Sequence, residues 1–115
     1  LWPVAALGRE AGPVALACAI VEERFEEDLS LADLSRLTGL PRHHLIRAFR
    51  AETGLTPHAY IVDVRIRRAR ERLRAGDMPG EVAAATGFCD QAHLTRAFKA
   101  RHGVTPGAFR AAYLS

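Results

Sequence analysis

The stretch Val82-Ala-Ala-Ala-Thr-Gly87 repeats the pattern of Leu34-Ser-Arg-Leu-Thr-Gly39, which lies 48 residues earlier in the chain. Two further blocks return with an offset of 49 residues. These pairs are His44-Leu-Ile-Arg-Ala-Phe-Arg50 with His93-Leu-Thr-Arg-Ala-Phe-Lys99, and Gly54-Leu-Thr-Pro57 with Gly103-Val-Thr-Pro106. One extra residue therefore lies between Gly87 and His93. Two copies are too few for a solenoid, so the pattern indicates a duplicated compact unit.

The first copy has the pattern of a helix, a short turn and a second helix. Ser30 and Asp33 have the spacing of a capping box, and the leucines after them, Leu31, Leu34 and Leu37, have helical spacing. Gly39 is placed to end this helix in the left-handed conformation. A second helix is predicted over residues 42–53, with Leu45 and Phe49 one turn apart on its buried side. This order is typical of a helix-turn-helix unit.

The second copy follows the same plan. Val82 and Ala85 are predicted to face the core, and Gly87 ends the helix. Residues 88–90 form the predicted turn, and a helix over residues 91–101 buries Leu94 and Phe98.

Three more helices complete the prediction. One covers residues 13–26, one residues 56–75, and a short closing helix follows Thr105-Pro106, with Phe109 and Tyr113 returning to the core. The fold class is therefore all-α, with about seven helices forming two helix-turn-helix subdomains joined by a long central helix. The predicted segments are a linker remnant (residues 1–12), the first subdomain (13–55), the linker helix (56–76) and the second subdomain (77–115).

Basic residues are concentrated in the middle of the chain. The net charge is −5 over residues 1–35, +7 over residues 36–76 and +1 over residues 77–115, which gives +3 in all. This asymmetry favours a polyanionic partner. The alternative is that arginine, a good helix former, occupies solvated helix faces.

The outward faces of the second helix of each copy carry side chains suited to the major groove of double-stranded DNA. Arginine pairs with guanine, glutamine pairs with adenine, and isoleucine, alanine or the methyl group of threonine can contact the thymine methyl. Arg47 and Arg96 occupy the same slot in the two copies. The predicted DNA-binding residues are Arg42, His43, Ile46, Arg47, Arg50, Gln91, Ala92, Thr95, Arg96 and Lys99.

The linker helix has a length that suits this function. At about 1.5 Å per residue it spans roughly 28 Å, close to the roughly 34 Å of one turn of B-DNA. It is therefore expected to act as a ruler between two reading units in direct order, and the DNA site is expected to be asymmetric.

The residues Ala85–Lys99 and Gly103–Arg110 resemble the C-terminal signature of AraC/XylS-type transcription regulators. The first copy and the linker helix are similar to the same family, so that the resemblance covers residues 14–113. It implies a seven-helix fold whose two recognition helices enter successive major grooves. It also implies groove-facing roles for the following residues: His43, Ile46 and Arg47 in the first unit, and Gln91, Ala92, Thr95 and Arg96 in the second.

Two positions depart from the family pattern. Pro41 and Cys89 stand where the family commonly has a serine cap before each recognition helix. Proline cannot cap through its side chain and cysteine is a poor cap, so Asp90 is the candidate acceptor for the second helix. The resemblance further implies an N-terminal sensor or dimerisation domain, and the first residue, which is not Met, suggests that such a domain is missing from this chain.

Other functions are less compatible with the sequence. The two cysteines and five histidines have no standard zinc spacing, so no cofactor, metal or enzymatic activity is predicted. No apolar run approaches a membrane span, and two widely spaced cysteines fit a reducing, cytoplasmic setting. An all-helical protein-interaction module is the alternative, with RNA polymerase as a possible partner of the acidic N-terminal third.

Overall fold

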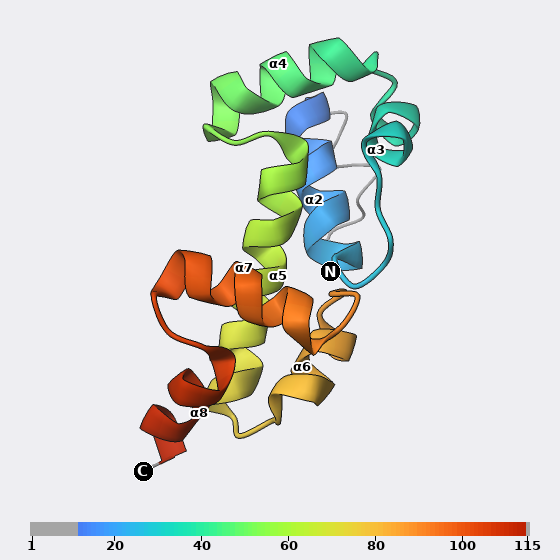
Figure 1. Ribbon diagram of the computed structural model, residues 1–115. Helices are drawn as coiled ribbons and strands as arrows, with labels where there is room; N and C mark the ends of the chain where they lie inside the picture. The colour runs from blue at the N-terminus through green and yellow to red at the C-terminus, as the bar shows by residue number, and fades with distance from the viewer. Residues whose placement is uncertain (1–11, 115) are drawn as a thin grey trace. The chain divides into compact units, whose positions relative to one another are not determined.

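The computed structural model describes residues 12–114, which form seven α-helices and no strand. This confirms the predicted all-α fold (Figure 1). The helices are α2 (Pro13–Arg24), α3 (Leu31–Thr38), α4 (Arg42–Thr53), α5 (Pro57–Arg74), α6 (Pro79–Ala85), α7 (Gln91–His102) and α8 (Pro106–Leu114). The predicted linker remnant, residues 1–12, lies outside the described residues except for Gly12.

The chain divides into two compact units, Leu1–Ile61 and Val62–Ser115, so that the boundary falls within α5. In the first unit, α2 packs against both α3 and α4. Apolar side chains from each of these helices are buried between them, among them Val21, Leu34 and Phe49. Because Leu45 and Phe49 are also fully buried, the outer side of α4 is left for the polar half of the helix.

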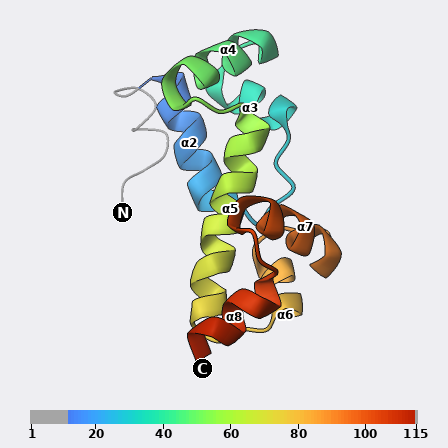
Figure 2. The ribbon, with the colours of Figure 1, turned by 60° about the vertical axis from the view of Figure 1, so that its left-hand side comes forward.

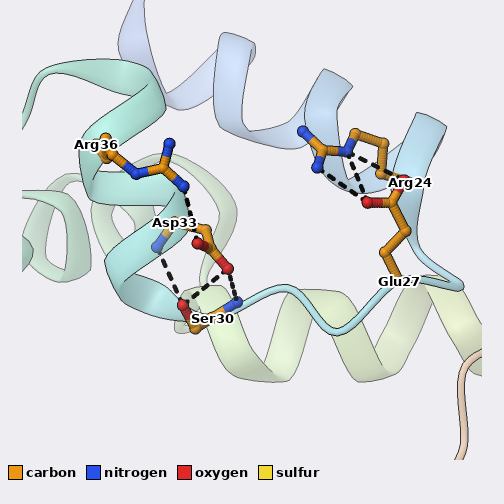
Figure 3. A network of polar contacts seen from close by, with 5 residues as sticks. All are labelled: Arg24, Glu27, Ser30, Asp33 and Arg36. Carbon is orange, nitrogen blue, oxygen red and sulfur yellow. Dashed lines mark hydrogen bonds and ion pairs between the residues drawn. The ribbon is translucent and has the colours of Figure 1, made fainter.

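A capping box fixes the start of α3, as Figure 3 shows. The backbone N–H of Asp33 donates to Oγ of Ser30 over 3.1 Å, and the backbone N–H of Ser30 donates to Oδ2 of Asp33 over 3.0 Å. Arg36 donates to the other carboxylate oxygen over 2.9 Å. The hydrogen bonds from Ser30, followed by that from Arg36, lower the pKa of Asp33 below its usual value. A separate ion pair joins Arg24, the last residue of α2, to Glu27 (Figure 3).

In the second unit, α7 packs against α6 and α8 (Figure 2). The core joins one side of α5 to α6 and α7, and Val62, Ala97 and Phe109 pack against it. Its buried members are Ile66, Ala69, Leu73, Val82, Ala83, Phe88, Leu94 and Phe98.

The repeated Thr-Pro pairs start helices as predicted. Thr56 accepts a hydrogen bond from the backbone N–H of Ala59 over 3.2 Å, and Thr105 accepts one from Ala108 over 3.1 Å. Threonine at the cap accepts from a backbone N–H that has no partner inside the helix, and proline at the first helical position has no N–H that would need one. The duplication is therefore retained in the geometry of both helix starts.

Four side chains lie elsewhere than the sequence pattern predicts. Leu37 and Tyr113 were expected on buried faces, but they are 39% and 53% exposed. Ala85 is only partly buried, and Ala83, two residues before it, takes the core position instead. Phe88, predicted as part of a turn, is 5% exposed and belongs to the core. Helices as short as α3 and α6 present few positions inward, so the neighbouring helix decides which side is covered.

Candidate nucleic-acid interface

Helix α4 presents a polar face on the side opposite its buried residues. Arg42, His43, Arg47 and Arg50 are exposed, and Ile46 is half-buried at the edge of the same face. The apolar side is fixed by Leu45 and Phe49, which are fully buried. All five predicted residues of α4 therefore lie on the helix, four of them fully available to a partner.

Helix α7 repeats this arrangement. Gln91, Ala92, Arg96 and Lys99 are exposed, and Thr95 is half-buried at the position equivalent to Ile46. Leu94 and Phe98 are fully buried. Arg47 and Arg96 are thus both exposed, each lying between a buried leucine two residues before it and a buried phenylalanine two residues after it.

The two helices begin differently. Pro41 precedes α4 and makes no side-chain cap, as its chemistry requires. At the equivalent position before α7, Oδ1 of Asp90 accepts the backbone N–H of His93 over 2.8 Å. Asp90 is therefore the cap that replaces the serine of the family pattern, and it places a carboxylate at the start of α7.

The histidines that follow these starts also differ. His43 and His44 are both exposed, with ring centroids 4.3 Å apart. His93 is half-buried and lies edge-on to Phe88 with a centroid distance of 5.1 Å. Burial of Phe88 explains this contact, which supports the first turn of α7 from the core side.

Side chains of α5 contact α4 in the first unit and α7 in the second. In the first unit, Tyr60 of α5 lies edge-on to Phe49 with ring centroids 5.3 Å apart. In the second, Nη1 of Arg101 donates to Oδ1 of Asp63 over 2.8 Å, and Nε of Arg67 donates to Oδ2 of Asp63 over 3.1 Å. The Arg101–Asp63 contact joins residues 38 positions apart in sequence, so a local sequence pattern does not show it.

His102, at the end of α7, is directed inward. Its ring lies 4.6 Å from that of Phe98 and 6.3 Å from that of Phe109, measured between centroids. Burial lowers the pKa of His102, and the positive charges of Arg70 and Arg101 lower it further. Within residues 12–114, its Nε2 is buried and has no hydrogen-bond partner. His102 therefore belongs to the packing of the second unit rather than to the exposed face of α7.

The cysteines and the possible metal-binding side chains are placed as follows. Residues 12–114 contain no group of three or more His, Cys, Asp or Glu side chains arranged to hold a metal ion. Cys18 is half-buried, Cys89 is exposed, and both are free thiols. No helix within that range has the length and apolar character needed to cross a membrane.

A family model described as a helix-turn-helix domain matches residues 34–112. This range includes most of α3 and all of α4, α5, α6 and α7. The chain belongs to the AraC-type helix-turn-helix family. Members of this family are DNA-binding domains of transcription regulators. The seven helices of this chain match the all-α fold of the family.

Curated relatives are similar to this chain over part of their own length. The HTH-type transcriptional regulator YbfI of Bacillus subtilis (strain 168) is 42% identical over 79 residues, which cover 69% of this chain and 29% of the relative. The regulatory protein ada of Salmonella typhimurium is 33% identical over 84 residues, which cover 73% of this chain and 23% of the relative. The chain thus spans less than a third of the length of these relatives.

Solved structures share the fold of the AraC-type domain over most of its length. The DNA-binding domain of AdpA, a global transcriptional factor solved in complex with a target DNA, has a TM-score of 0.84 and 30% identity, covering 88% of this chain and 92% of that one. A transcriptional regulator with an AraC-type DNA-binding domain from Chromobacterium violaceum has a TM-score of 0.81 and 27% identity, covering 88% and 91%.

Proposed function

We propose that this chain is a sequence-specific double-stranded DNA-binding module of a transcription regulator, which reads bases through α4 and α7. The observation that carries the proposal is the equivalence of Arg47 and Arg96, both exposed on the same slot of a duplicated helix. AdpA, whose DNA-binding domain was solved on its target DNA, supports the choice of partner. Arginine at such a position can donate two hydrogen bonds to O6 and N7 of guanine.

The proposed interface consists of the exposed and half-buried residues of the two recognition helices. Arginine and lysine contact guanine or phosphate, Gln91 contacts adenine, and Ile46, Ala92 and Thr95 contact thymine methyl groups. The contributing residues are Arg42, His43, Ile46, Arg47, Arg50, Gln91, Ala92, Thr95, Arg96 and Lys99.

The order of the two copies along the chain defines the kind of DNA site. Because the copies stand in direct order and differ in sequence, one chain should recognise an asymmetric site. We propose that the two recognition helices enter successive major grooves, so that two base-specific segments lie about one helical turn apart. The α4 segment and the α7 segment should then differ in sequence.

Selection of bound duplexes from a random library, using the chain as it stands, tests this function. The expected result is a non-palindromic motif with two segments roughly 10 base pairs apart. Affinity for the selected duplex, measured by fluorescence anisotropy, should fall steeply as salt rises because phosphate contacts release counterions. Insertion of about five base pairs between the segments should abolish the gain over random DNA. Absence of any enriched motif would refute the proposal.

A protein partner is the second candidate for part of the surface. Glu23 and Glu26, near the end of α2, are exposed in the acidic first third of the chain. We propose RNA polymerase as a partner of this region. We further propose that the module belongs to a regulator whose N-terminal sensor or dimerisation domain lies outside this chain. We assign the module a cytoplasmic location and no catalytic role. Glu23→Lys combined with Glu26→Lys should reduce transcription in a reconstituted assay while DNA affinity is kept. An unchanged transcript level would exclude the contact.

A further inference from the structure

We propose that Asp90 is a specificity-determining residue, whose free carboxylate oxygen accepts a hydrogen bond from the N4 amino group of a cytosine in the DNA segment read by α7. This inference rests on the proposed function, because it assigns one base preference within that interface. It goes beyond capping, which uses only one of the two oxygens of the side chain.

The geometry at the start of α7 leaves half of the carboxylate unused. Oδ1 of Asp90 is held by the backbone N–H of His93 at 2.8 Å, which fixes the side chain at the tip of the helix. Across residues 12–114, Oδ2 makes no hydrogen bond or ion pair, and Asp90 is exposed. Gln91 and Ala92, which follow directly, are also exposed. The unused acceptor is thus fixed next to the residues proposed to read bases.

The chemistry of the major groove selects the base. A carboxylate can only accept, and cytosine presents an N4 amino donor with no acceptor of its own at that edge. Adenine also has an amino donor, but its N7 acceptor lies beside it and would repel the carboxylate. Phosphate oxygens repel the carboxylate as well. Asp90 therefore favours cytosine and disfavours non-specific contact with the backbone.

The first copy has no carboxylate at the position equivalent to Asp90. Pro41 precedes α4 without a side-chain cap, and Arg42, His43 and His44 follow it. The start of α4 thus has no acidic side chain, whereas the start of α7 has a fixed one. The preference for cytosine is accordingly expected in one of the two DNA segments only.

Selection from random duplexes with the wild-type chain, Asp90→Asn and Asp90→Ser tests the inference. Both substitutions keep a side-chain oxygen that can cap α7. A parallel selection with Arg96→Ala identifies the α7 segment, because that segment contains the DNA positions that lose their base preference in this variant. Asp28→Asn is the matched control, because it removes an exposed carboxylate outside α7. Thermal unfolding of each variant verifies that it is folded.

The wild type should prefer cytosine by about ten- to a hundredfold at one position of the α7 segment, as expected for one hydrogen bond to a charged acceptor. Asp90→Asn should shift that position toward adenine, which pairs with an amide through N6 and N7. Asp90→Ser should lose the preference, and both should bind random DNA a few fold more tightly. Asp28→Asn should leave the motif unchanged.

Retention of the wild-type motif by both folded Asp90 variants would overturn the inference and leave the proposed function intact. The inference would also be overturned if Asp28→Asn changed the base preference at that position as much as Asp90→Asn does. A wild-type chain that selects no motif would overturn the proposed function, and the assignment of Asp90 with it.

Discussion

The hydroxyl group of Tyr60 donates a hydrogen bond to Oε2 of Glu22 over 3.0 Å, although the two residues are 38 positions apart in sequence. The same tyrosine ring lies edge-on to Phe49 on the buried side of α4. One side chain of α5 thus contacts α2 through its hydroxyl group and α4 through its ring. Its placement connects the stability of the first unit to the position of the residues proposed to read DNA.

Tyr60→Phe should lower the free energy of unfolding by about 0.5–1.5 kcal/mol, because it removes one partly buried hydrogen bond and keeps the ring. Urea unfolding followed by circular dichroism measures the change. Tyr113→Phe is the matched control: Tyr113 is 53% exposed, and its loss of a hydroxyl group should change stability by less than about 0.5 kcal/mol. Equal effects of the two substitutions would contradict a specific role for the Tyr60–Glu22 bond.

Alkaline pH should destabilise the wild type more than Tyr60→Phe. Burial raises the pKa of Tyr60, and Cys18 and Glu22 raise it further. Because the unfolded tyrosine ionises near pH 10, its contribution is complete below about pH 10 and is lost as pH rises toward the folded-state pKa. Urea midpoints between pH 8 and pH 11 should therefore converge at the upper end for the two proteins. A constant difference across that interval would show that Tyr60 ionises equally in both states.

Arg47→Ala and Arg96→Ala should each weaken binding by on the order of 1–3 kcal/mol, and each should relax base preference in a different segment of the site. Both side chains are exposed, so folding should be little affected. Titrations against duplexes mutated in one segment at a time separate the two effects. Arg24→Ala, which removes an arginine paired with Glu27 at the end of α2, is the control and should bind almost normally. Loss of preference in the same segment for both variants would contradict separate reading by α4 and α7.

Gly39→Ala should destabilise the chain by about 1–2 kcal/mol, because φ is +78° at this position and a side chain is penalised there. A Cβ at Gly39 would meet no atom within 4 Å, so the cost is one of backbone conformation and not of space. Gly107→Ala, inside α8 and equally open, should instead stabilise by about 0.4–1 kcal/mol. Thermal unfolding of both variants measures the two changes, and a shift of the same sign for both would refute this account.

The sequence by itself determined the duplicated plan and the ends of the helices. Ser30 with Asp33, Thr56, Thr105 and Gly39 act through hydrogen bonds or backbone angles within a few residues, and the structure has each of them in the predicted role. Asp90 caps α7 for the same local reason. Such interactions join residues that are close in sequence, so the local sequence pattern is enough to predict them.

The tertiary structure alone decided which ambiguous side chains are covered and which distant groups meet. Phe88 enters the core, Leu37 and Tyr113 do not, and Asp63 receives Arg101 from 38 residues away. Burial depends on the helix that packs opposite, and ion pairing depends on the distance between two elements, so neither is encoded within a short window. The exposed arginine slot lies between these cases. Its repetition is visible in the sequence, but its exposure follows from the burial of Leu45, Phe49, Leu94 and Phe98 in their two cores.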